Sequence, residues 1–192
     1  QTLEVQFRPG GIAATLGGDA GVAGDLLGIL DFSFNRVEGF HLGVAYDTER
    51  LIPLLSLHGG IAYGFSDKVM KYGLGATIYT TTKRTLGFGG EVYRRLDYRP
   101  DQGYYDEFAN TPGALIDKND YRDYHSARGW RAYMTHAPSR TLEWTLSFIN
   151  EQHWAVTTNT TFSIFSPSVL FRENSAVQEG NLRSLRVEAR LG

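Results

Sequence analysis

The segment from Ser56 to Leu96, "SLHGGIAYGFSDKVMKYGLGATIYTTTKRTLGFGGEVYRRL", decides the fold. Its residues alternate between two kinds of side chain: every second position is mostly large and apolar, and the positions between are small or polar. The alternation stops at the polar residues 66–68 and 80–85 and resumes after each of them. Successive side chains of a β-strand point to opposite faces of the sheet. The segment therefore predicts three antiparallel strands with one apolar face and one small or polar face.

The same alternation continues through most of the chain, at residues 2–8, 40–47, 130–134, 142–148 and 185–191. Residues 99–121 contain two prolines, two glycines and mixed charges, which predicts one long loop without an amphipathic helix. We also expect a Thr/Asn-rich strand at about 155–165. The whole chain, residues 1–192, is interpreted as a single β domain.

Composition excludes several classes of protein. The 19 basic and 21 acidic residues give a net charge of −2, which argues against a nucleic-acid partner. The chain has no cysteine, so disulfides, thiolate metal sites and cysteine nucleophiles are excluded. No run approaches the ~18 apolar residues of a membrane helix. The mean hydropathy of −0.28 is compatible with a membrane barrel, because alternation hides lipid-facing residues in the average.

Three architectures fit the alternation: a β-sandwich, a soluble barrel of lipocalin type and a transmembrane barrel. The polar face favours the last, because it carries many glycines and few charges and is therefore unlike a wet surface. Aromatic residues such as Tyr46, Tyr72 and Trp144 lie near the ends of the apolar rows, as at membrane–water boundaries. The prediction is an all-β, antiparallel transmembrane β-barrel of about 10–12 strands, either complete or a shortened or partial barrel.

This prediction assigns side chains to faces by their parity along the strands. The residues expected to face lipid are Leu42, Val44, Ile61, Tyr63, Leu74, Ile78, Phe88, Val92, Leu142, Trp144 and Leu146. The polar residues expected to face the lumen are His41, His58, Glu91, Arg95, Arg131, Glu143, Arg186, Glu188 and Arg190. We expect 99–121 to be the longest loop and extracellular, on the same side as 66–69, with 48–54 and 81–85 on the periplasmic side. In a closed barrel, residues 2–8 would pair with residues 183–191.

Four segments in order carry a family resemblance: "FNRVEGFHLGVAY", "AYGFSDKVMKYGLGATIY", "RGWRAYMTHAPSRTLEWTLSFINEQH" and "VQEGNLRSLRVEARLG". Together they resemble the C-terminal barrels of bacterial surface-antigen (BamA/TamA-like) outer-membrane proteins, over most of residues 30–192. The resemblance implies a bacterial outer-membrane location and a non-enzymatic role in envelope transport, protein insertion or membrane anchoring. It also implies outer-membrane lipid, other envelope proteins or periplasmic domains as partners. The chain departs from that family in supporting fewer strands and in ending with "EARLG" where a terminal aromatic is usual.

The sequence offers few candidates for chemistry. None of the five histidines stands in a metal-binding spacing such as HExxH, although His41 and His58 could approach each other inside a barrel. The run "DKNDYRD" could bind calcium through Asp117, Asn119, Asp120 and Asp123, but it lacks the EF-hand glycine and glutamate, so a solvated loop is favoured. A hydrolase would need groups such as His125, Ser126 and Asp123 to converge, but neighbours in a strand point to opposite faces. We therefore expect no enzyme and no cofactor, with an outer-membrane hydrolase and a soluble carrier barrel as alternatives.

Overall fold

The computed structural model describes residues 2–8, 11–17, 29–48, 53–98, 107–139 and 141–191. It contains one antiparallel sheet in which every strand pairs with its neighbours in the sequence, in the order β1 to β10. The expected all-β, antiparallel fold is confirmed. The strands are β1 (Thr2–Arg8), β2 (Gly11–Gly17), β3 (Ile29–Asn35), β4 (Gly39–Asp47), β5 (Leu55–Gly64), β6 (Val69–Tyr79), β7 (Leu86–Tyr98), β8 (Tyr124–His136), β9 (Leu142–Ala155) and β10 (Gly180–Leu191).

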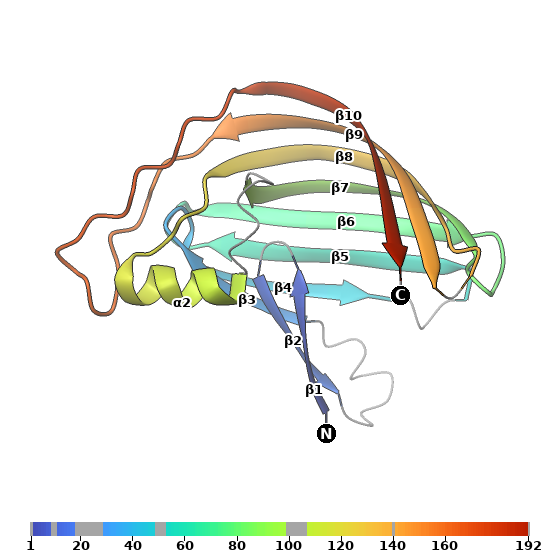
Figure 1. Ribbon diagram of the computed structural model, residues 1–192, viewed down its shortest axis with the longest axis horizontal. Helices are drawn as coiled ribbons and strands as arrows, with labels where there is room; N and C mark the ends of the chain where they lie inside the picture. The colour runs from blue at the N-terminus through green and yellow to red at the C-terminus, as the bar shows by residue number, and fades with distance from the viewer. Residues whose placement is uncertain are drawn as a thin grey trace.

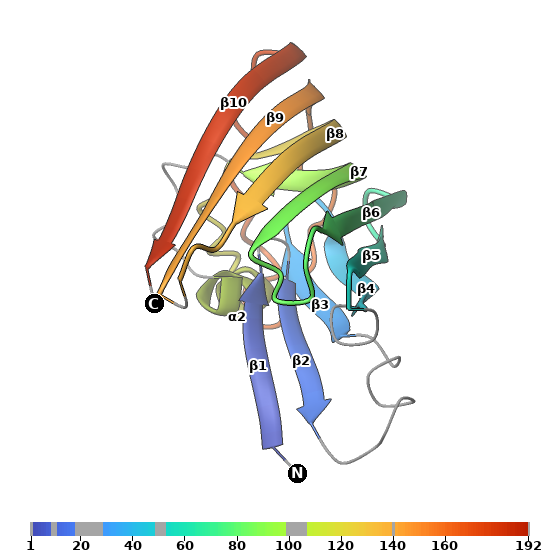
Figure 2. The ribbon, with the colours of Figure 1, turned by 90° about the vertical axis from the view of Figure 1, so that its right-hand side faces the viewer.

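The sheet curves into an open arch, with β10 at one edge and the β1–β2 hairpin at the other (Figure 1). Strands β3 to β10 are joined by continuous ladders of seven to thirteen residue pairs. By contrast, β2 pairs with β3 at only three positions, Ile12 to Ala14. Consequently the hairpin splays away from the arch, as Figure 2 shows.

Closure between residues 2–8 and 183–191 is not found. Among the described residues, β10 pairs with β9 and β1 pairs with β2, and no ladder joins β1 to β10. The physical reason is the short β2–β3 ladder, which lets the first hairpin turn away from the edge that β10 presents. The fold is therefore an open, barrel-like sheet.

The connections of the arch separate into two groups. The turns after β3 and β5 and the long connections after β7 and β9 share one end, which we call the long-connection end. The connections at 48–54, 80–85 and 137–141 lie at the opposite end of the strands. The described parts of the connections at 66–69, 99–121, 48–54 and 81–85 are grouped as expected from sequence, while residues 49–52 and 99–106 lie outside the described residues.

Two expectations about the long connections are wrong. Part of 99–121 forms helix α2 (Glu107–Asp117), with Pro112 inside it. Residues 156–179 contain no strand, because their backbone bonds to other connections instead of to a sheet: Ile164 N–H donates to Leu115 O at 2.9 Å. Within the described part of the chain, no helix is both long enough and apolar enough to cross a membrane.

Helix α2 covers the part of β3 that β2 leaves unpaired. Thr111 Oγ1 accepts a hydrogen bond from the backbone N–H of Phe34 at 3.4 Å. Phe34, Ala114 and Phe171 pack together in the small buried apolar cluster of the fold. The helix thereby satisfies a strand edge that would otherwise expose backbone donors.

Candidate functional site

The convex face of the arch is apolar and exposed. All eleven residues expected to face lipid lie on this face by the register of the ladders. Leu74 keeps 51% of its surface exposed and Ile78 keeps 64%, although both are large and apolar. A soluble monomer rarely exposes a contiguous apolar surface of more than a few hundred Å². The convex face exposes its large apolar side chains in neighbouring rows on β4 to β10.

The concave face carries the polar groups and a cavity of about 350 Å³. Its lining comes from β3 to β7, from α2 and from the residues around the start of β8. Its lining includes apolar residues and charged groups of both signs, among them Asp31, Glu38, Glu91, His41, His58, Lys71 and Arg95. Most of these charged groups are paired with one another: Glu38 contacts His41 and Lys71, and Glu91 contacts His58.

Glycines on this face make room for large polar neighbours. A Cβ atom at Gly75 would lie 2.2 Å from His58 Nε2, and one at Gly89 would lie 2.4 Å from Tyr133 Cζ. Each glycine thus leaves space for a side chain of the neighbouring strand. This explains why the sequence pairs large apolar residues outside with small residues inside.

The first polar cluster surrounds the buried carboxylate of Glu38, in the turn between β3 and β4. Lys71 Nζ donates to it at 2.7 Å, His41 Nδ1 lies 2.9 Å away, and Asn35 Nδ2 donates at 2.6 Å. Burial alone would raise the pKa of Glu38, but the hydrogen bond and charge of His41, together with Lys71, lower it to about 2. Lys71 also donates to Asp67 at 2.6 Å, so the cluster joins the turns after β3 and β5.

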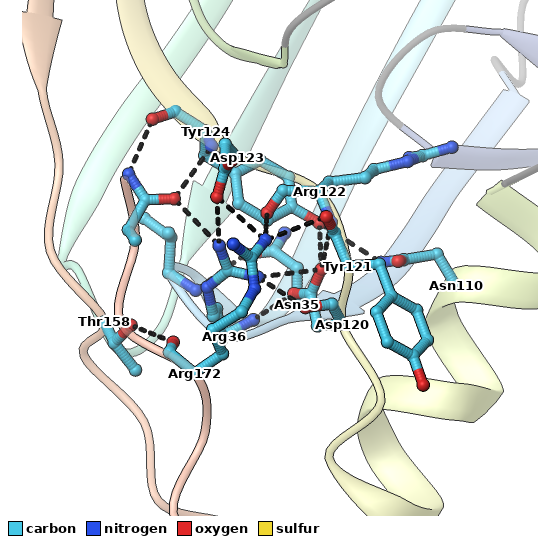
Figure 3. A network of polar contacts seen from close by, with 12 residues as sticks. Asn35, Arg36, Asn110, Asp120, Tyr121, Arg122, Asp123, Tyr124, Thr158 and Arg172 are labelled. Carbon is cyan, nitrogen blue, oxygen red and sulfur yellow. Dashed lines mark hydrogen bonds and ion pairs between the residues drawn. The ribbon is translucent and has the colours of Figure 1, made fainter. Parts of the chain in front are cut away.

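The second cluster is centred on Arg36, in the same turn, whose side chain is completely buried. Its Nη1 donates to the backbone O of Asp120 at 2.6 Å, and its Nη2 donates to Asp123 Oδ1 at 3.2 Å. The backbone N–H of Arg36 donates to Asp120 Oδ2 at 2.9 Å, and Nη2 also donates to Asn174 Oδ1 at 3.0 Å. Burial lowers the pKa of Arg36, while the carboxylate of Asp120 opposes that shift. Figure 3 shows Arg36 beside Asp120 and Asp123.

Arg36 ties three connections together. Asp120 and Asp123 follow α2, and Asn174 belongs to the connection between β9 and β10. The same connection returns to the turn through Asn159, whose backbone N–H donates to Arg36 O at 3.0 Å. Asn174 Nδ2 also donates to the backbone O of Tyr124 at 2.7 Å. The long-connection end is therefore one cross-linked polar unit.

A row of charged pairs crosses the concave face from β5 to β10. His58 Nε2 lies 3.6 Å from Glu91 Oε2, and Arg131 lies 3.8 Å from Glu91 and 3.2 Å from Glu188. These contacts place four of the predicted lumen residues in one network.

The remaining predicted lumen residues lie on the same face in separate contacts. Arg95 pairs with Asp97 at 3.0 Å, and Glu143 accepts a hydrogen bond from Thr135 at 3.0 Å. The register of β10 places Arg186 and Arg190 there too, opposite Ser147 and Glu143. His41 and His58 do not pair with each other, since each takes its own carboxylate partners.

The candidates for chemistry do not converge. His125 is buried on the concave face, where its ring lies 4.6 Å from that of His153, whereas Ser126 points to the convex face. Two members of the candidate calcium set, Asp120 and Asp123, bind Arg36 instead. Within the described ranges, no three His, Cys, Asp or Glu side chains gather as a metal site would require.

Sequence reasoning missed the residues that carry the buried clusters: Asp31, Arg36, Glu38 and Lys71. The available signal was the charged turn "NRVEG", which places an arginine and a glutamate between two apolar strands. A turn of this kind is usually solvated, so its burial depends on α2 and the β9–β10 connection.

The fold and site together define an open antiparallel β-sheet with an apolar convex face, a charged concave face and one end closed by cross-linked connections. The chain belongs to the family of unknown function DUF5686: residues 24–189 match the model of the DUF5686 C-terminal domain. No curated protein matches the chain. No solved structure matches it either.

Proposed function

We propose that this domain is a membrane-embedded β-sheet of the bacterial outer membrane, with a non-enzymatic role in the envelope. The observation that carries the proposal is the contrast between its faces: the convex side exposes rows of large apolar residues, and the concave side holds every Asp and Glu of β3 to β10. In lipid, such an apolar band is solvated by acyl chains, and the ladders satisfy the backbone groups of the strands between the two open edges of the sheet. In water, the same band would favour aggregation.

The role that we propose within the envelope is membrane anchoring or assembly of other envelope proteins, as the surface-antigen resemblance implies. The hydrogen bonds of Arg36 support this role, because they hold the long connections in one fixed arrangement at one end of the strands. A soluble carrier would also use the concave cavity, but it would have to cover the convex face. An enzymatic role lacks a converged nucleophile, base and acid among the described residues.

Cysteine labelling tests the membrane proposal, because the chain contains no cysteine of its own. In vesicles, a hydrophilic maleimide should not react with Ile78→Cys until the protein is denatured. It should react readily with Thr82→Cys, an exposed position in the connection after β6. Equal labelling of both variants in a detergent-free soluble protein would contradict the proposal and favour the carrier.

Orientation is tested in intact cells with the same reagent. Outer-membrane barrels keep short turns in the periplasm, so Ser168→Cys, exposed in the β9–β10 connection, should be labelled from outside. Thr82→Cys should be labelled only after the outer membrane is permeabilised. The reverse pattern would invert the proposed orientation.

A further inference from the structure

Three arginines stand on the otherwise uncharged convex face. The ladders place Arg94 of β7, Arg128 of β8 and Arg183 of β10 on this face. Every Asp and Glu within β3 to β10 faces the concave side: Asp31, Asp47, Glu91, Asp97, Glu143, Glu151 and Glu188. The three arginines therefore share a face with no strand carboxylate.

The arrangement of these arginines is unfavourable without an anion. Arg94 and Arg128 are direct partners across the β7–β8 ladder. Directly opposite residues have Cβ atoms roughly 5 Å apart, and like charges at that spacing destabilise a sheet. The side chain of neither arginine forms an ion pair or hydrogen bond with a residue that the structure describes.

Polar and aromatic side chains surround the arginines. Arg128 lies opposite Gln152, Gln152 lies opposite Asn181, and Asn150 lies opposite Arg183. A surface hollow of about 480 Å³ next to Arg94 and Arg183 is lined by Arg128 together with Tyr72, Val92, Gly129, Trp130, Asn150, Glu151, Gln152 and Asn181. The carboxylate of Glu151 is engaged on the concave side, where it accepts a hydrogen bond from Tyr93 and lies 2.9 Å from His153.

The position along the strands points to a membrane boundary. Arg94 and Arg128 lie near the ends of β7 and β8 that carry the long connection. Towards the short turns, the same face continues with apolar residues such as Phe88, Met134, Leu146 and Val187. Trp130 adjoins the arginines, as tryptophan does at the headgroup level of a bilayer.

We propose that Arg94, Arg128 and Arg183 bind the phosphate of a lipid headgroup in the membrane leaflet at the long-connection end. Guanidinium groups match phosphate in geometry and donate two hydrogen bonds to it. Gln152, Asn150 and Asn181 supply amide donors for the neighbouring polar atoms of the headgroup. The acyl chains of the lipid then lie along the apolar part of the convex face, on the side of the short turns. This site rests on the membrane-embedded function proposed above.

The test measures binding of diphosphoryl lipid A to the purified full chain in zwitterionic detergent by native mass spectrometry. The variant Arg94→Gln/Arg128→Gln should bind this lipid at least ~10-fold more weakly, because it loses two charge-assisted contacts. The matched control Arg186→Gln/Arg190→Gln removes two arginines from the concave face of β10 and should bind like the wild type. Lipid A stripped of its phosphates by phosphatase should bind the wild type as weakly as intact lipid A binds the double variant.

Three results would overturn the proposal: an unchanged affinity in Arg94→Gln/Arg128→Gln, an equal loss in the control, or equal binding of the dephosphorylated lipid. The affinity of the wild type for inorganic phosphate is measured as well. If inorganic phosphate binds as tightly as lipid A does, the ligand is a free anion and the lipid assignment is wrong. Labelling of Ile78→Cys in vesicles distinguishes a failure of the headgroup site from a failure of the proposed membrane function. If Ile78→Cys is shielded from the maleimide but lipid A binds Arg94→Gln/Arg128→Gln as tightly as the wild type, only the headgroup site is refuted. If Ile78→Cys reacts freely in vesicles, the membrane function itself is refuted.

Discussion

Replacing Arg36 with methionine should loosen the long-connection end. The substitution keeps much of the apolar volume but removes the donors to Asp120 O, Asp123 Oδ1 and Asn174 Oδ1. Breaking a buried ion pair by removing one partner costs ~3–5 kcal/mol, because the other charge stays buried.

The structure places Arg36→Met at the low end of that range. Asp123 keeps Arg172, 2.8 Å away, and Asp120 keeps the hydroxyl of Tyr124 and the backbone N–H of residue 36. We therefore expect a loss of about 3 kcal/mol in the free energy of opening this end, which corresponds to roughly a 100-fold change in the opening equilibrium.

Hydrogen exchange followed by mass spectrometry measures this opening. Peptides covering 156–174 should exchange roughly 100-fold faster in Arg36→Met, whereas peptides from β6 and β7 should be unaffected. Arg172→Met is the matched control. Its guanidinium contacts Asp123 and donates to the backbone O atoms of Tyr121 and Arg122, but its side chain is 44% exposed, so its loss should cost less than about 1 kcal/mol. Equal exchange in Arg36→Met and wild type would refute the reasoning that Arg36 holds the connections together.

Leu74→Arg should destabilise the membrane-embedded protein by ~2–4 kcal/mol in equilibrium unfolding from lipid, and a neutral result would argue against lipid contact at this position. Gly89→Ala should cost ~1–3 kcal/mol because its methyl group meets the ring of Tyr133, whereas Gly73→Ala, which has open space, should be near neutral; equal effects would refute the space-filling argument. The folded-state pKa of Glu38, about 2, lies below its ordinary 4.5, so its contribution to stability is present above pH 4.5 and is lost as the pH falls towards 2. Acid titration of unfolding should show this loss in the wild type and a smaller one in Glu38→Gln, and identical profiles would contradict it.

The sequence determined most of the strands and their faces, although it also predicted a strand at about 155–165 that the structure does not contain. Alternation of period two is a local property, so the parity of residues such as Ile61 and His58 could be read without knowing their partners. The antiparallel pairing of strands that are joined by short polar breaks also followed, because such breaks favour pairing between neighbours. The long connections after β7 and β9 carry no such constraint. Every residue assigned to the apolar or polar face by parity lies on that face of the sheet.

Tertiary structure decided what has no local periodicity. Helix α2 could not be predicted, because its segment contains Pro112 and has mixed polarity. The helix forms where it covers the free edge of β3. The burial of Arg36 depends on Asp120, Asp123 and Asn174, which are 84, 87 and 138 residues away in the chain. The sheet likewise stays open because only three residue pairs join β2 to β3. The sequence by itself determined which side of each strand is apolar, and only the assembled sheet decided which charges meet, because contacts between distant connections leave no repeating pattern in the chain.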